Sequence, residues 1–145
     1  MRDLYDNIAT VQLMAPVDIG ASDTYSSIAD LQDFEQCDII VNLGVCTAAT
    51  GNTYVTPTLQ DSDSLKEADF AAVGATYYLG GLTKVDDVAE DNTVQRVGYI
   101  GSKRYIRVLM DVTSTMSNIP VSITAILSGA RHNPPTAPTV LATTG

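Results

Sequence analysis

The sequence predicts an all-β protein, a β-sandwich or jelly roll of about seven to eight antiparallel strands with extended N- and C-terminal arms. Three observations support this. Thr, Val and Ile, whose β-branched side chains favour strands, make up 41 of the 145 residues. Apolar and polar residues alternate with a two-residue period in several segments. Turn signals rich in Gly, Asn, Asp and Ser recur along the chain, which is typical of sandwiches and barrels.

Polar turns separate the expected strands in the first part of the chain. Pro57 interrupts one of these strands, and because proline has no backbone N–H to donate, that segment is expected at a sheet edge or a bulge. Residues 65–73 are the one expected short helix or irregular stretch, and residues 85–92 form an acidic loop. The expected strands are residues 8–17, 25–31, 38–45, 53–60 and 77–79.

The strand patterns are clearer in the second part. Residues 94–100 lead through Gly101-Ser102, expected to be a hairpin turn, into residues 103–112. Residues 121–127 alternate in the same way. The face of 103–112 that we expect in the core carries Arg104 at its end, followed by Ile106, Val108, Met110 and Val112.

The length of 145 residues favours one domain with an ordinary core. We expect a single β-sandwich domain over residues 1–130, including an N-terminal segment, and an extended Pro-rich arm over 131–145. The longest apolar runs fall short of the roughly 20 residues that a membrane helix needs. Residues 1–6 lack the apolar stretch of a secretory signal. We therefore expect no membrane partner.

The net charge of −9 is unevenly distributed. Residues 1–95 contain three basic and 16 acidic residues, whereas residues 96–145 contain five basic residues and one acidic residue. The positive part is expected to face a neighbouring molecule, because opposite potentials favour docking. The alternative is that strands from the two parts interleave, so that the asymmetry disappears in space. An acidic chain also disfavours nucleic-acid binding, which needs a basic face.

Two cysteines and one histidine leave little basis for metal chemistry. Cys37 and Cys46 lie in one apolar segment, and in a single strand their sulfurs would be about 30 Å apart, too far for a disulfide bond. With His132 alone and no paired Cys/His spacing, we expect no metal and no cofactor. The cysteines are expected to be small apolar core residues in a reducing compartment.

No catalytic constellation is evident, and we expect that the chain is not an enzyme. His132 stands beside Asn133-Pro134-Pro135 in the apparent tail, where no partner would position it, so a surface or contact role is expected. The Asp61-x-Asp63 spacing lacks the further ligand and glycine of a calcium loop, which favours a solvated turn.

Basic residues cluster near aromatic ones in the segment 99–107. Three positive charges in an acidic chain make a weak nucleic-acid surface, so salt bridges within a sheet or across a subunit contact are favoured. The residues concerned are Lys103, Arg104 and Arg107, with Tyr99 and Tyr105.

Five segments carry a resemblance to a known family. They are MRDLYDNI (1–8), TLQDSDS (58–64), ADF (68–70), VGYIGSKRYIRV (97–108) and SGARHNP (128–134). In these segments the chain resembles small proteins encoded among the head genes of tailed bacteriophages and prophages. The resemblance implies a capsid decoration (cement) protein or another head-associated structural protein, located on the virion surface and made in the cytoplasm of the host bacterium.

The resemblance further implies the major capsid protein as partner, and self-association, with a trimer at local threefold axes as a hypothesis. We expect the segment 1–8 and the arm 131–145 to make the contacts, because neither can bury itself alone. An exposed ion pair contributes only about 0–1 kcal/mol, so repeated contacts must supply most of the affinity. The candidate contact residues are Leu4, Tyr5, Ile8, Arg104, Arg107, Arg131, His132, Pro134 and Pro135.

Two other functions stay open. A head–tail joining or tail component would be present in about six or twelve copies per particle, against hundreds for a decoration protein. A carbohydrate-binding β-sandwich displayed on the virion would need exposed aromatic platforms. The chain has no Trp, and Tyr77-Tyr78 is the one visible aromatic pair.

Overall fold

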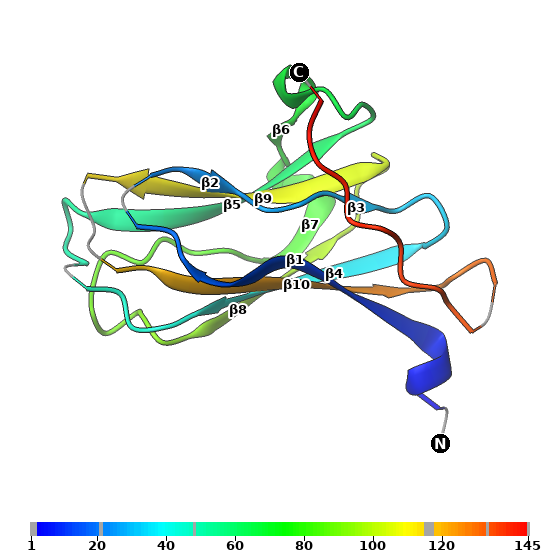
Figure 1. Ribbon diagram of the computed structural model, residues 1–145, viewed down its shortest axis with the longest axis horizontal. Helices are drawn as coiled ribbons and strands as arrows, with labels where there is room; N and C mark the ends of the chain where they lie inside the picture. The colour runs from blue at the N-terminus through cyan, green and yellow to red at the C-terminus, as the bar shows by residue number, and fades with distance from the viewer. Residues whose placement is uncertain (1–2, 21, 48, 115–117, 133, 145) are drawn as a thin grey trace.

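Two antiparallel β-sheets pack face to face in the computed structural model, as the sequence predicts (Figure 1). The structure describes residues 3–20, 22–47, 49–114, 118–132 and 134–144. Sheet A has the strand order β1-β10-β4-β8-β7, and sheet B has the order β2-β9-β5-β6, with β3 also paired to β9. All pairings between these strands are antiparallel.

Within the described residues there are ten strands, against about seven to eight expected. The difference arises because three strands of sheet B have only two residues each, too few to show an alternation. Sheet A contains β1 (Ile8–Asp18), β10 (Pro120–Ser128), β4 (Gln36–Leu43), β8 (Val94–Tyr99) and β7 (Tyr78–Gly81). Sheet B contains β2 (Thr24–Tyr25), β9 (Tyr105–Thr113), β5 (Tyr54–Ser62) and β6 (Ala71–Ala72), with β3 (Ala29–Asp30) beside β9.

Helical structure among the described residues is limited to three short 3-10 turns. They are η1 (Tyr5–Asn7), η2 (Glu67–Asp69) and η3 (Ala75–Tyr77). The second lies within the segment 65–73, where a short helix or irregular stretch was expected. In the part of the chain that the structure describes, no helix has the length and apolar character needed to span a membrane.

Alternate residues of the long strands point between the sheets and form the core. On β9, Ile106, Val108 and Met110 are fully buried, as the alternation of 103–112 predicts. Burying one such side chain contributes about 1.5–3 kcal/mol relative to leaving it exposed. The fully buried side chains that face them from sheet A include Ile39, Val41, Leu43, Ile123 and Leu127.

Pro57 lies at a free edge of β5, which confirms its predicted position. β9 pairs with β5 along its whole length, whereas β6 pairs only with Gln60 and Asp61. The backbone N–H of Val55 donates outward to the Val85 carbonyl, at 3.2 Å. Since residues two apart in a strand point the same way, the nitrogen of Pro57 also faces this outer edge, where no ladder bond is lost.

The predicted hairpin at Gly101-Ser102 is wrong, because the chain crosses there from one sheet to the other. Tyr99 ends β8 in sheet A, and Tyr105 begins β9 in sheet B. The crossing lets the apolar rows of both strands face the same core from opposite sides. It is tight: a Cβ added at Gly101 would lie 2.5 Å from Cζ of the buried Tyr99 ring, so only glycine fits without displacing the ring.

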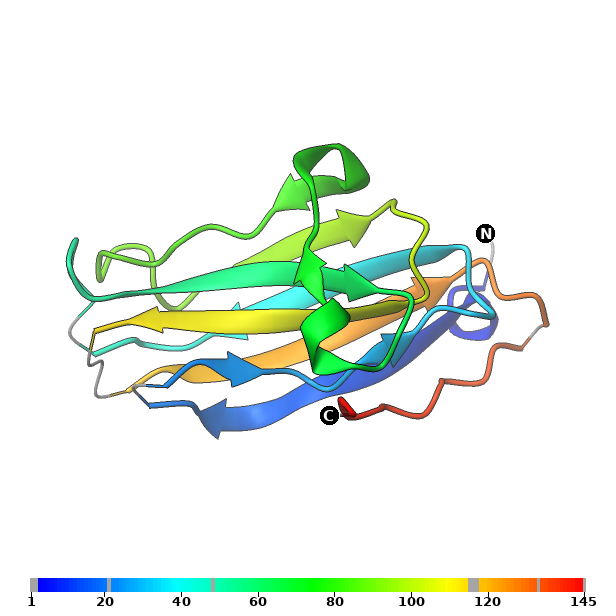
Figure 2. The same ribbon diagram turned by 90° about the horizontal axis from the view of Figure 1, so that it is seen from above.

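The C-terminal segment is extended, as predicted, and runs back along its own domain (Figures 1 and 2). Leu141 exchanges two backbone hydrogen bonds with Ile28, of 2.9 and 3.1 Å. Thr144 donates to the Leu65 carbonyl at 2.8 Å. Leu141 also packs against a small cluster formed by Ile28, Phe70 and Tyr105. The last residues of the chain and the segment around η2 therefore lie over part of sheet B.

Candidate contact surfaces

The two segments predicted to make contacts, the N-terminal segment and the C-terminal arm, meet at one end of the sandwich. Residues 4–6 and 8–10, with 134, 135 and 137, line a groove of about 660 Å³. Leu4 is 68% and Tyr5 is 87% exposed, the latter being the most exposed large apolar side chain described. Ile8 is half-buried because it opens β1 and pairs with Ser128. We call this feature the terminal groove.

The arm supplies the other wall of the terminal groove. Pro134 is exposed and Pro135 is half-buried, and both line the groove. Arg131 and His132 lie just before it with exposed side chains, and the Arg131 N–H donates to the Asp33 carbonyl at 3.0 Å. Residue 133 lies outside the described residues. The structure thus brings together Leu4, Tyr5, Ile8, Pro134 and Pro135, and places Arg104 and Arg107 elsewhere.

Arg104 is engaged by its own chain. Its Nε and Nη2 atoms donate to the two carboxylate oxygens of Asp30, at 2.9 and 2.7 Å. This two-bond geometry fits a guanidinium to a carboxylate and holds both side chains. The hydrogen bond from Arg104 keeps the pKa of Asp30 below its usual value. A partner that recruits Arg104 would have to compete with this pair.

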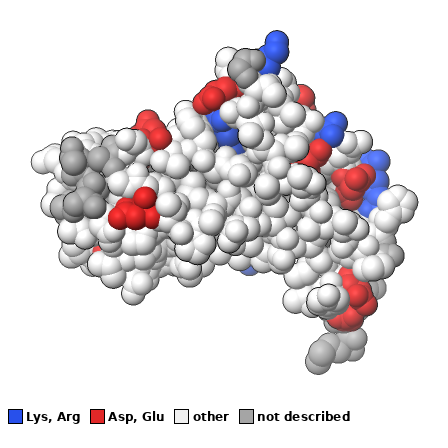
Figure 3. All heavy atoms as spheres, viewed as in Figure 1, with Lys and Arg blue, Asp and Glu red and all other residues white. Residues whose placement is uncertain are grey.

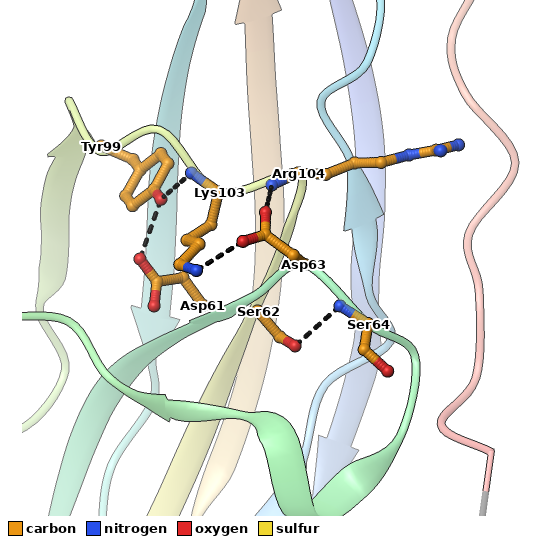
Figure 4. Close-up of polar contacts among 7 residues, drawn as sticks. All are labelled: Asp61, Ser62, Asp63, Ser64, Tyr99, Lys103 and Arg104. Carbon is orange, nitrogen blue, oxygen red and sulfur yellow. Dashed lines mark hydrogen bonds and ion pairs between the residues drawn. The ribbon is translucent and has the colours of Figure 1, made fainter.

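A hydrogen-bond network beside this pair connects the segment between β8 and β9 to the end of β5 (Figure 4). The Tyr99 hydroxyl donates a hydrogen bond to the Asp61 carboxylate at 2.8 Å. It accepts one from the backbone N–H of Lys103 at 3.0 Å. The side chain of Lys103 in turn forms an ion pair with Asp63. The Asp63 carboxylate also accepts a hydrogen bond from the backbone N–H of Arg104. Burial and the bond to Asp61 raise the pKa of Tyr99. Asp61 and Asp63 are therefore bound to protein groups.

Arg107 is buried, which corrects its prediction as a candidate contact residue. Its side chain is only 3% exposed. The guanidinium carbon lies 4.1 Å from the ring centre of Tyr25 and 4.3 Å from that of Phe70. Nε donates to Gln60 at 2.9 Å, whereas buried Nη1 has no hydrogen bond and lies 3.9 Å from Glu67. Burial lowers the pKa of Arg107. It fastens the segment around η2 to sheet B and cannot reach another molecule.

The charge asymmetry of the sequence disappears in the folded chain, which is the alternative that interleaved strands would produce. Arg96, Lys103 and Arg104 pair with Asp38, Asp63 and Asp30, all from the acidic first part. Figure 3 shows basic and acidic groups side by side over the end of the sandwich and the projection above it. Among the described residues, Arg131 is the one basic residue after Gln95 without an ion pair.

The other residues weighed in the sequence have structural surroundings. Within the described ranges, no group of three or more His, Cys, Asp or Glu residues is placed to hold a metal ion. Cys37 and Cys46 are free and buried. Burial raises the pKa of the Cys37 thiol to about 12 and that of Cys46 to about 11. Tyr77 is exposed whereas Tyr78 is half-buried against the core, so the two rings do not share one exposed platform.

The outward-facing side of sheet A was not predicted as a contact surface. The strands of this sheet were identified from their apolar rows. Apart from Ile8, no contact role was predicted for the residues that alternate with those rows. The signal was nevertheless present, because those same strands carry isoleucine at outward positions 40 and 126. The two residues are half-buried on a face that nothing else in the described chain covers.

Comparison with known proteins finds similar solved structures. No family model and no curated protein sequence matches it. The crystal structure of the VP2 subviral particle of infectious bursal disease virus matches with a TM-score of 0.50 and 11% identity, over 88% of this chain and 33% of that one. The structure of the Gx strain of the same virus matches at 0.48 and 12%, over 90% and 34%.

A third structure comes from a different class of protein. The CBM22-1–GH10 modules of Clostridium thermocellum xylanase 10B with xylohexaose match with a TM-score of 0.47 and 15% identity, over 94% of this chain and 29% of that one. The chain thus spans about a third of the length of the chains it matches. At this identity, the likeness to VP2 shows a shared fold.

Two substitutions of Arg107 separate its packing from its charge. Arg107→Ala is expected to lower the free energy of unfolding by about 2–4 kcal/mol, because it opens a cavity between two aromatic rings. Arg107→Met is expected to lose less than half as much, since methionine fills the space without a buried charge. Urea unfolding followed by circular dichroism measures both. Equal losses of unfolding free energy in the two variants would show that the charge of Arg107 holds the segment around η2.

The Asp30–Arg104 pair predicts a pH dependence. Because the pKa of Asp30 is lowered in the folded protein, its stabilisation is complete above the unfolded value of about 3.9 and is lost as the pH falls through the folded value. The contribution is at most about 1 kcal/mol for a partly exposed pair. The stability difference between wild type and Asp30→Asn should therefore shrink in acid.

NMR titration of the Asp30 carboxyl carbon checks this directly. In Arg104→Gln the midpoint should move upward, towards that of an unpaired aspartate. An unchanged midpoint would show that Arg104 does not set the acidity of Asp30.

Proposed function

We propose that this chain is a structural protein of a virion, and more narrowly a decoration protein that binds the outside of an assembled phage head. The observation that carries the proposal is the terminal groove, in which the N-terminal segment and the beginning of the C-terminal arm meet around strongly exposed apolar side chains. Such a groove suits a partner segment that is presented only by an assembled lattice. The resemblance to phage head proteins and the fold shared with VP2, a protein of a viral particle, support it.

The mechanism that we propose is stabilisation by mass action. A protein that binds the assembled shell and not its separated subunits adds its binding free energy to that of the shell. The contacts around Leu4 and Tyr5 would supply apolar burial, which the isolated ion pairs cannot replace. We propose the major capsid protein as the partner. We propose neither nucleic acid nor a membrane as a partner. We propose no enzymatic role, because His132 lies exposed on the arm and Asp61 and Asp63 are engaged in structural bonds.

Copy number in purified particles tests the proposed function. Particles from the virus or prophage that encodes this chain should contain it in hundreds of copies, arranged on the outer surface, as capsid symmetry requires of a decoration protein. Quantitative mass spectrometry and cryo-electron microscopy measure number and location together. About six or twelve copies would favour a head–tail joining component. Absence from particles would rule out both roles.

The same particles test the terminal groove. A chain carrying Leu4→Asp and Tyr5→Asp should fold normally, because both side chains are exposed, but should fail to bind particles that lack the protein. Val88→Asp is the matched control, since Val88 is 64% exposed in the acidic loop away from the groove. Binding by the groove variant at the control's level would place the particle contact elsewhere.

A further inference from the structure

The outward-facing side of sheet A is bare, whereas that of sheet B is partly covered. Figure 1 shows β6 and the C-terminus beyond sheet B, and Figure 2 looks onto that covered side. The segment around η2 packs on Arg107 of β9, and Leu141 of the arm packs on Ile28. No described segment is bonded over the opposite side of sheet A. We call that side the open face.

The register of sheet A defines the residues of the open face. Paired residues lie side by side across the five strands, so the outward row at Ile126 continues through Asp38 and Gly98 to Leu79. The next row includes Gln12, Thr124, Ile40, Arg96 and Gly81. Further outward positions are Ile8, Thr10, Ser122, Ser128, Gln36, Asn42, Val94 and Ile100.

Opposite charges lie side by side at the centre of the open face, on a chain of net charge −9. Its centre holds one carboxylate, Asp38, and one guanidinium, Arg96, and these two form an ion pair with each other. Two further carboxylates lie at its margins: Glu35 lines the hollow described below, and Asp18 ends β1 opposite Pro120. Two copies of an acidic protein repel each other over most of their surfaces, and this central pair offers each copy an opposite charge for both of its members.

The open face also has relief. Gly98 carries no side chain, and a hollow of about 460 Å³ lies over it, lined by Leu79, Ile100 and Ile126 among others. A Cβ at Gly98 would lie 3.0 Å from Oδ1 of Asp38, so the glycine also leaves room for the ion pair. Leu79 is 63% exposed beside the hollow. Aliphatic projections next to a hollow allow two such faces to interlock.

We propose that two copies of this chain associate through their open faces about a twofold axis, with Arg96 of each copy facing Asp38 of the other. A twofold contact brings residue i of one copy to residue j of its partner and j to i. A face with one positive and one negative side chain side by side is therefore complementary to itself. This favours a second copy over a partner of single-sign charge.

The dimensions of the open face suit such an association. Five strands about 4.8 Å apart and about 25 Å long give about 600 Å² per copy. A standard stable interface buries about 800 Å² per partner, so we expect a reversible dimer at the weak end of that class. Two sheets that meet in this way pack about 10 Å apart, as in a sandwich. The association is independent of the proposed virion role, because it is a property of the isolated chain.

Sedimentation velocity over a concentration series tests the proposal. The wild type should move from 15.4 kDa towards twice that mass as its concentration rises. Arg96→Glu puts two carboxylates side by side at the centre of each open face and should weaken the dimer by more than about tenfold, because like charges then face each other. Asp38→Lys should weaken it similarly by placing two positive charges there.

Mixing the two variants provides the decisive arm of the experiment. The Arg96→Glu chain and the Asp38→Lys chain should each be monomeric and should form a mixed dimer together. Lys84→Glu is the matched control: it changes the net charge as Arg96→Glu does, but Lys84 packs over Tyr54 of sheet B, so the dimer should persist. Thermal unfolding of each variant shows whether it is folded.

Four results would overturn the proposal. These are a wild type that stays monomeric throughout, an Arg96→Glu variant that dimerises like the wild type, two folded variants that do not combine, and a Lys84→Glu variant that loses the dimer. The last would mean that net charge, and not the open face, governs association. None of these outcomes bears on whether particles contain the protein.

Discussion

The two-residue period of side chains along a β-strand is the constraint on which the rest of this molecule depends. On β4, Ile39 and Val41 point into the core while Asp38 and Ile40 point outward, and the register with β8 and β10 carries that division across sheet A. A shift of one residue would exchange the two rows. The inner rows therefore supply most of the stability of the sandwich, and the outer rows face away from its core.

The outward-facing rows of the two sheets differ in burial, because segments of the chain cover part of sheet B. On sheet B, Arg107 occupies an outward position, and its guanidinium is stacked between rings from β2 and the segment after η2. This stacking holds the segment around η2 over sheet B. Phe70 of that segment forms a cluster with Ile28 and Tyr105, against which Leu141 of the C-terminal arm packs. Sheet A has no comparable anchor at its outward positions. At its centre, Asp38 and Arg96 form an ion pair with each other.

Periodic features were predictable from the sequence, whereas features set by distant contacts were not. The alternation at Ile106, Val108 and Met110 identified the inner row of β9, and the missing N–H of Pro57 identified an edge. The crossing at Gly101 was not predictable, because a hairpin and a change of sheet use the same turn residues and differ only in the partners that Tyr99 and Tyr105 find. The burial of Arg107 depends on Phe70 and Tyr25, far away in sequence, and an arginine in a polar context carries no local signal of it. The terminal groove was predicted as two separate contact segments, but their meeting depends on the path of the arm.

The central claim is that the outward surfaces of this β-sandwich serve to bind other chains, and that the open face binds a second copy. Two-dimensional NMR spectra recorded over a dilution series test this most directly, residue by residue. The predicted result is that resonances of Ile40, Ile126, Leu79 and Arg96 shift together with concentration, whereas those of Thr56, Thr58 and Asp111 on sheet B stay constant. Spectra that do not change on dilution, or shifts confined to sheet B, would contradict it.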